Sequence, residues 1–146
     1  MGSTKAGVKA GSLCGAVMGL LGAMVGLPLI LAFSYHELVI PPSESLTVES
    51  LALFVFATNT LGATVVGALL GAFYGRMYER LPGSTLIRKG LPLGLAAWIA
   101  EGPIVMIATW HIMPALMQLI RVSASLVGSL AFAGLLGFVY DRLKAR

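Results

Sequence analysis

The sequence has few charged residues and a single cysteine. Only 11% of its 146 residues are charged, whereas a soluble domain carries about a quarter. One cysteine, Cys14, excludes an intramolecular disulfide, and its place inside an apolar run indicates a small packing residue. The sequence also lacks a nucleophile–base arrangement, a glycine-rich phosphate loop and a cysteine cluster. We therefore expect a protein that is not an enzyme and needs no cofactor.

Long apolar runs make up most of the chain. Hydrophobic residues account for 58% of the sequence, and the mean hydropathy is +0.91. A transmembrane helix needs about 20 mainly apolar residues, and four runs meet this condition, at about 10–33, 51–75, 91–110 and 122–140. The first run is too long for the apolar core of a signal peptide, so we expect it to be retained. The sequence thus predicts an all-α integral membrane protein with one four-helix transmembrane domain over residues 1–146.

The connections between the runs predict an orientation. The outer loop 35–50 holds three glutamates and no basic residue, whereas the 76–90 loop is strongly basic. With four crossings, that loop and both termini share one side, which holds nine of the 10 basic residues; only Arg121 lies on the other side. The positive-inside rule makes this side cytoplasmic, in a multi-pass protein of the cell membrane. The charge also predicts contact with anionic lipid head groups and argues against nucleic acid as a partner.

Two pairs of segments in the chain resemble each other. The segment 68–77, ALLGAFYGRM, aligns with 134–143, GLLGFVYDRL, at an offset of 66 residues. The odd-numbered runs match at an offset of 79, where Gly11 and Gly15 correspond to Gly90 and Gly94. We expect two similar helical hairpins, related by an axis along the membrane normal as in a parallel repeat.

Small residues recur at helical spacing in every run. Lipid tails are as apolar as leucine, so membrane helices associate where small side chains let their backbones approach. We expect helix packing rather than a pore lining from these positions. The glycines that carry this prediction are Gly11, Gly15, Gly19, Gly22, Gly26, Gly67, Gly71, Gly75, Gly90, Gly94 and Gly137, and the weakly polar or small members of the same rows are Asn59, Ala63, Ser125, Ser129 and Ala133.

A single carboxylate, Glu101, lies near the centre of the third run. An ionisable group at that depth costs at least ~2.5 kcal/mol unless protein or water receives it. Helical periodicity places Glu101 on the same face as Gly90 and Gly94, so we expect it in a helix interface. Thr64 and Ser129 lie at a similar depth and are its expected partners, with Asn59 reached through a water or a tilt.

Three functions fit these observations. The leading hypothesis is a non-catalytic subunit that packs into a larger membrane complex or a homo-oligomer. The second is a minimal proton- or cation-coupled channel or transporter that uses Glu101. The third is a small redox or metal subunit, in which His36, His111 and Met113 would be soft ligands for copper or a haem. No histidine lies in mid-span, which argues against the third hypothesis.

Overall fold

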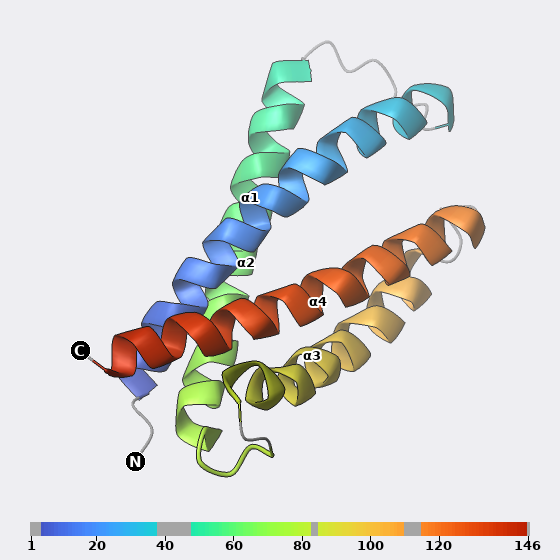
Figure 1. Ribbon diagram of the computed structural model, residues 1–146. Helices are drawn as coiled ribbons and strands as arrows, with labels where there is room; N and C mark the ends of the chain where they lie inside the picture. Colours follow the sequence, from blue (N-terminus) through green and yellow to red (C-terminus); the bar gives the residue numbers. More distant parts are fainter. Residues whose placement is uncertain (1–3, 38–47, 83–84, 110–114, 146) are drawn as a thin grey trace.

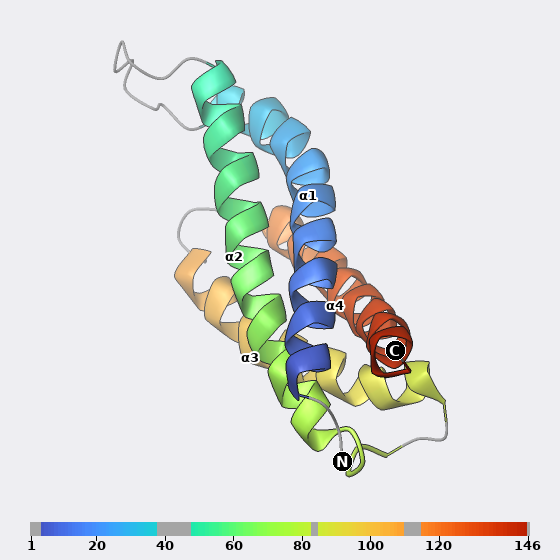
Figure 2. The same cartoon turned by 90° about the vertical axis from the view of Figure 1, so that its left-hand side faces the viewer.

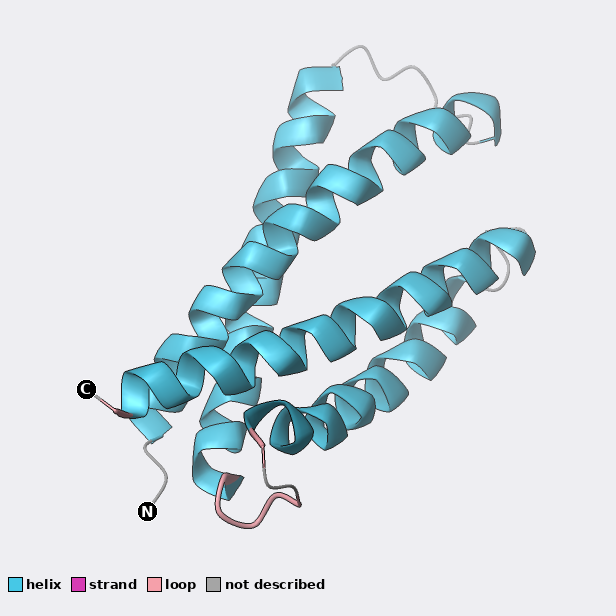
Figure 3. Cartoon of the chain, viewed as in Figure 1, coloured by secondary structure: helices cyan, strands magenta, loops and turns pink. Residues whose placement is uncertain are grey.

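The chain folds into four helices. The computed structural model describes residues 4–37, 48–82, 85–109 and 115–145, although the side chains of 29–37, 48, 51, 86–87, 100–106, 108–109, 115–117 and 121 lie outside that description. The helices are α1 (Thr4–Glu37), α2 (Val48–Met77), α3 (Leu86–Thr109) and α4 (Ala115–Lys144). Figure 3 shows helices and short loops, with no strand among the described residues. The all-α prediction is confirmed over these ranges.

Three helices contain a stretch that is long and apolar enough to cross a membrane. These candidate spans are Thr4–Pro28, Ala52–Met77 and Gln118–Lys144, and they indicate a multi-pass membrane protein. The remaining predicted crossing, the third run at 91–110, lies mostly in α3, and the side chains of 100–106 and 108–109 lie outside the described part of the chain. The count of four crossings therefore stays a prediction.

The helices form two antiparallel hairpins, α1–α2 and α3–α4. α1 and α2 run side by side over most of their length (Figure 2), and α1 also packs on α4. Both chain termini lie at one end of the molecule, and the two hairpins diverge from that end (Figure 1). We call it the basic end, because its described residues include eight cations against two carboxylates, Glu79 and Asp141. The cations are Lys5, Lys9, Arg76, Arg80, Arg88, Lys89, Arg142 and Lys144.

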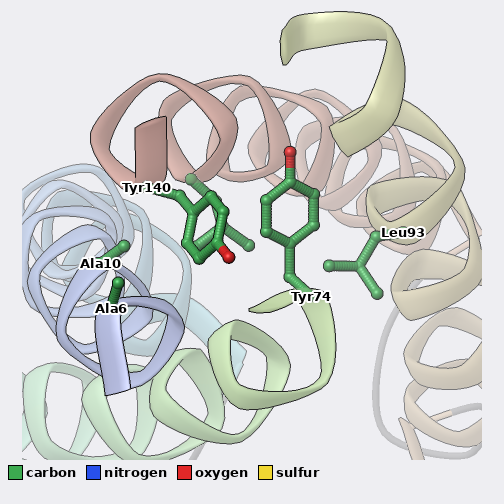
Figure 4. Close-up of a cluster of buried hydrophobic side chains, with 6 residues drawn as sticks. Ala6, Ala10, Tyr74, Leu93 and Tyr140 are labelled. Atoms are coloured by element: carbon green, nitrogen blue, oxygen red, sulfur yellow. The ribbon is translucent and has the colours of Figure 1, made fainter. Parts of the chain in front are cut away.

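The buried core lies near the basic end, where the hairpins meet. Figure 4 shows Tyr74 of α2 and Tyr140 of α4 next to small alanines of α1 and a leucine of α3. The cluster consists of Ala6, Ala10, Tyr74, Leu93, Leu136 and Tyr140. Elsewhere the helices expose large apolar side chains such as Leu53, Ile107 and Val127. A soluble monomer rarely exposes so much apolar surface, whereas a lipid-facing surface requires it.

Candidate functional site: the helix interfaces and the basic end

Glycine brings the backbones of α1 and α2 into direct contact. A Cβ atom added to Gly11 would run into the carbonyl oxygen of Gly67, and one added to Gly15 would run into that of Ala63. Further along, a Cβ on Gly19 would lie 2.7 Å from the carbonyl oxygen of Asn59. The four-residue spacing on both helices makes one continuous line of small residues, which is how helices pack closely in lipid.

The same line extends past the predicted positions at one end. Gly7 lies against Gly71 and Gly75, so that a Cβ on Gly7 would be 3.1 Å from the Cα atom of Gly75. The predicted set of packing glycines did not include Gly7, because the first apolar run was predicted to begin at about residue 10. The signal was present, since Gly7 precedes Gly11 by four residues, and α1 begins at Thr4.

Glycine also joins α3 to α4, but over a shorter length. A Cβ on Gly90 would run into the carbonyl oxygen of Ala133, and one on Gly94 would lie 2.7 Å from the carbonyl oxygen of Ser129. One turn after Gly94, the next residue of this row on α3 is Trp98. Its indole Nε1 donates a hydrogen bond of 3.2 Å to the carbonyl oxygen of Val122. Gly137, which the sequence also placed in this set, is buried in α4.

The pairs in the two hairpins correspond through the offsets found in the sequence. Adding 79 to the α1 position and 66 to the α2 position converts the pair Gly11–Gly67 into Gly90–Ala133. The same operation converts Gly15–Ala63 into Gly94–Ser129. The two alignments, which were read from different helices, therefore describe one common packing register.

The two hairpins touch through α1 and α4. Ala6 and Ala10 share the buried core with Tyr140 and Leu136, and the Cε atom of Met18 lies 4.0 Å from a Cβ position on Gly128. The α1 residues in this row are four apart, and the next members are Gly22 and Gly26. A Cβ on either glycine would have no described atom within 4 Å. Over the part of the chain that the structure describes, these two glycines therefore lie outside the helix interfaces.

The proposed partners of Glu101 bond within their own helices. The Thr64 hydroxyl donates to the carbonyl oxygen of Thr60 at 2.6 Å, and the Asn59 amide donates to that of Val55 at 2.9 Å. Within the α3–α4 hairpin, Ser129 packs against Gly94. The Glu101 side chain lies outside the described residues, so its pairing with Thr64, Asn59 or Ser129 stays a prediction.

The metal hypothesis rests on residues that the structure does not describe. The side chain of His36 and all of His111 and Met113 lie outside the described ranges. Among the side chains that are described, no three histidines, cysteines or carboxylates come close enough to hold a metal ion. Cys14 is buried in α1 as a free thiol.

Three tyrosines and two lysines gather at the basic end. Tyr74 and Tyr140 meet edge to face with ring centroids 5.3 Å apart, and Tyr78 lies 4.9 Å from Tyr140. The ammonium groups of Lys89 and Lys144 lie 4.1 and 4.8 Å from the centroid of the Tyr78 ring. Such distances are typical of cation–π contacts. The sequence gave no sign that the two hairpins bring these tyrosines together.

The cluster has two polar features of its own. Burial raises the pKa of the Tyr78 hydroxyl, and the nearby Asp141 carboxylate and Tyr140 add to the rise, so Tyr78 is neutral at physiological pH. The hydroxyl of Tyr74 is fully buried and has no hydrogen-bond partner among the described residues. A buried hydroxyl without a partner costs free energy.

No protein-family model, curated protein or solved structure matches this chain. The features that bear on function are therefore the glycine contacts within the hairpins and the tyrosine–lysine cluster at the basic end.

Proposed function

We propose that this chain is a non-catalytic subunit of a membrane assembly, formed either with other membrane proteins or with further copies of itself. It crosses the membrane four times, as two similar hairpins whose termini and basic end face the cytoplasm. The basic end favours this orientation, because cytoplasmic loops carry an excess of Lys and Arg. The matching registers Gly11–Gly67 and Gly90–Ala133 support the duplicated hairpin.

The observation that carries the proposal is the open space at glycines in the outer half of hairpin one. Gly22 and Gly26 continue the α1 row of Ala10, Cys14 and Met18, which is packed closer to the basic end, yet no described atom lies within 4 Å of a Cβ on either. On α2, Gly62 is exposed and open in the same way. Small residues in a bilayer favour close approach of a helix. These positions thus suit a helix from another subunit.

The test is the mass of the purified protein in detergent and in lipid nanodiscs, for the natural chain and for Gly22→Leu. No described atom lies within 4 Å of a Cβ on Gly22, and this residue is exposed, so we expect normal helicity and yield but loss of the assembly. The matched control is Gly134→Leu on α4, a glycine that is also open but does not continue the α1 row. A natural chain that is monomeric and binds no other protein in both media would overturn the proposal.

The proton- or cation-coupled alternative has one observation in its favour. The offset of 79 makes Glu101 the counterpart of Gly22, which lies where the hairpins diverge. A carboxylate at that level of α3 would be available to a pathway between hairpins or between subunits. Replacing Glu101 with Gln separates the two functions, because it should abolish proton-dependent flux in the alternative and leave assembly unchanged in the leading proposal.

The redox or metal subunit is the least supported proposal, since no contact among the described residues favours it. A colourless, metal-free preparation from cells supplied with iron and copper would remove it.

A further inference from the structure

The Tyr78 ring collects cations from both helices of hairpin two. The Lys89 ammonium, from the first turn of α3, lies 4.1 Å from the ring centroid and donates a hydrogen bond of 3.3 Å to the backbone carbonyl of Tyr78. The Lys144 ammonium, from the last turn of α4, lies 4.8 Å from the same centroid. Two helices, α3 and α4, and the turn that follows α2 thus contribute to one small basic site.

Packing fixes the position of the ring. The Tyr78 centroid lies 5.6 Å from that of Tyr74, which is buried, and 4.9 Å from that of Tyr140, which is buried as well. A ring held by two buried neighbours restricts where an ammonium group can sit on it. A lysine held on this ring has fewer positions open to its ammonium group, so less side-chain entropy is lost when it binds an anion.

The site also lies at the depth of a membrane surface. Tyr78 directly follows the candidate span that ends at Met77, and Lys144 is the last residue of the candidate span that begins at Gln118. In a bilayer these boundaries stand at the level of the lipid head groups. An anion that is already concentrated at this level is the phosphate of a phospholipid.

The surrounding charge favours an anionic ligand. Each ammonium has three N–H donors, and Lys89 uses one of them on the Tyr78 carbonyl. Two carboxylates act on the site, Asp141 near Tyr78 and Glu79 near both lysines. They do not balance the eight described cations of the basic end. A surplus of positive charge at the cytoplasmic boundary attracts anionic lipids.

We propose that Lys89 and Lys144 bind the phosphate group of an anionic phospholipid, with the Tyr78 ring as the platform that holds both ammonium groups. Because this site joins α2 to α3 and α4, a bound lipid bridges the two hairpins. The inference does not depend on whether the chain assembles with other subunits.

The test is native mass spectrometry of the detergent-solubilised full chain titrated with phosphatidylglycerol, phosphatidylcholine or inorganic phosphate. The variant Lys89→Gln/Lys144→Gln removes the site, and Lys5→Gln/Lys9→Gln on α1 removes the same charge from the same end. We expect phosphatidylglycerol to bind roughly tenfold more weakly to the first variant and to change less than about threefold for the second. The conservative variant Lys89→Arg/Lys144→Arg should retain binding, because guanidinium also binds phosphate and aromatic faces.

Three results would overturn the proposal. The first is an equal loss in both charge-removal variants, which would mean diffuse attraction without a site. The second is equal binding of phosphatidylcholine to the natural chain, and the third is displacement of the lipid by inorganic phosphate at equal concentration. If the Gln double variant does not fold, the single change Lys144→Gln gives the same comparison with Lys9→Gln.

Discussion

The two hairpins share a packing register near the basic end and differ in their outer halves. In α1–α2, glycine contact runs from Gly7 to Gly19, and one step further Ala23 and Val55 are both buried. In α3–α4 the glycine contact ends at Gly94, and the next position in the line, the counterpart of Gly19, is Trp98. In α1–α2 the two helices are therefore in backbone contact from Gly7 to Gly19. In α3–α4 the backbone contact ends at Gly94, and the Trp98 side chain makes the next contact.

The difference shows where a repeated hairpin can vary. Near the basic end both hairpins meet through Tyr74 and Tyr140, which correspond at the offset of 66, so a change there affects both. In the outer halves the hairpins diverge, and each can change alone. The counterparts of Gly19 and Gly22 are Trp98 and Glu101, the one indole and the one carboxylate of the 91–109 segment.

The largest effect is expected from closing the space between α1 and α2. In Gly11→Leu the side chain would run into the Gly67 backbone, which cannot move without separating the helices. Overpacking costs roughly 1–3 kcal/mol in cores that can relax, and we expect about 3 kcal/mol or more here. Thermal unfolding in detergent measures it. Gly134→Leu, at a glycine where no described atom lies within 4 Å of an added Cβ, is the matched control and should unfold near the natural temperature.

A smaller loss is expected from the corresponding change in hairpin two. In Gly90→Leu the side chain would meet the Ala133 backbone, but the glycine contact of α3–α4 is shorter, so fewer contacts are lost when the helices separate. We expect about 1–3 kcal/mol, measured by the same unfolding experiment. A loss as large as that of Gly11→Leu would show that both hairpins depend equally on backbone contact.

Trp98→Phe tests the side chain that replaces glycine in hairpin two. Phenylalanine keeps most of the apolar contact but cannot donate to the Val122 carbonyl. A net hydrogen bond is worth roughly 0.5–1.5 kcal/mol, and we expect a loss of that size, seen as a lower midpoint of thermal unfolding. No change would mean that packing alone closes this hairpin.

The smallest effect distinguishes the two corresponding tyrosines. The Tyr74 hydroxyl is buried without a hydrogen-bond partner among the described residues, so Tyr74→Phe should be neutral or stabilising by up to about 1 kcal/mol. Tyr140→Phe keeps the ring contacts with Tyr74 and Tyr78, and because Tyr140 is not without a partner, we expect this change to be destabilising. Unfolding midpoints of the two variants, compared side by side, give the sign. A clear loss in Tyr74→Phe would reveal a bound water or ligand at that hydroxyl.

Much of the fold could be predicted from the sequence, because helix packing in lipid depends on residue size at fixed spacing. The rows through Gly11 and Gly67 and the offsets of 66 and 79 were enough to predict two similar hairpins that pack through small residues, whereas the pairs that meet, such as Gly11 and Gly67, are known only from the structure. Helix ends were less accurate: α1 begins at Thr4 and α4 at Ala115, well before the predicted runs, since hydropathy marks the lipid-facing part of a helix and not its hydrogen-bonded ends.

The basic-end cluster could not be predicted in the same way. Lys89 and Tyr78 lie on either side of a loop, and Lys144 lies far along the chain, so their contact depends on the angle between the hairpins. Gly22 shows the same limit, because its spacing is as regular as that of Gly19 and only the divergence of the hairpins leaves it in open space.

The contact of Met18 with Gly128 bears on how the two hairpins can rotate relative to each other. The Met18 Cε atom lies 4.0 Å from the position of a Cβ atom on Gly128, so a flexible thioether chain faces a residue without a side chain. Both residues lie near the middle of their helices, so a rotation of one hairpin about this point would separate α1 from α4 at one end while it brings them together at the other. The packing of the tyrosines at the basic end therefore limits how far the outer ends can move.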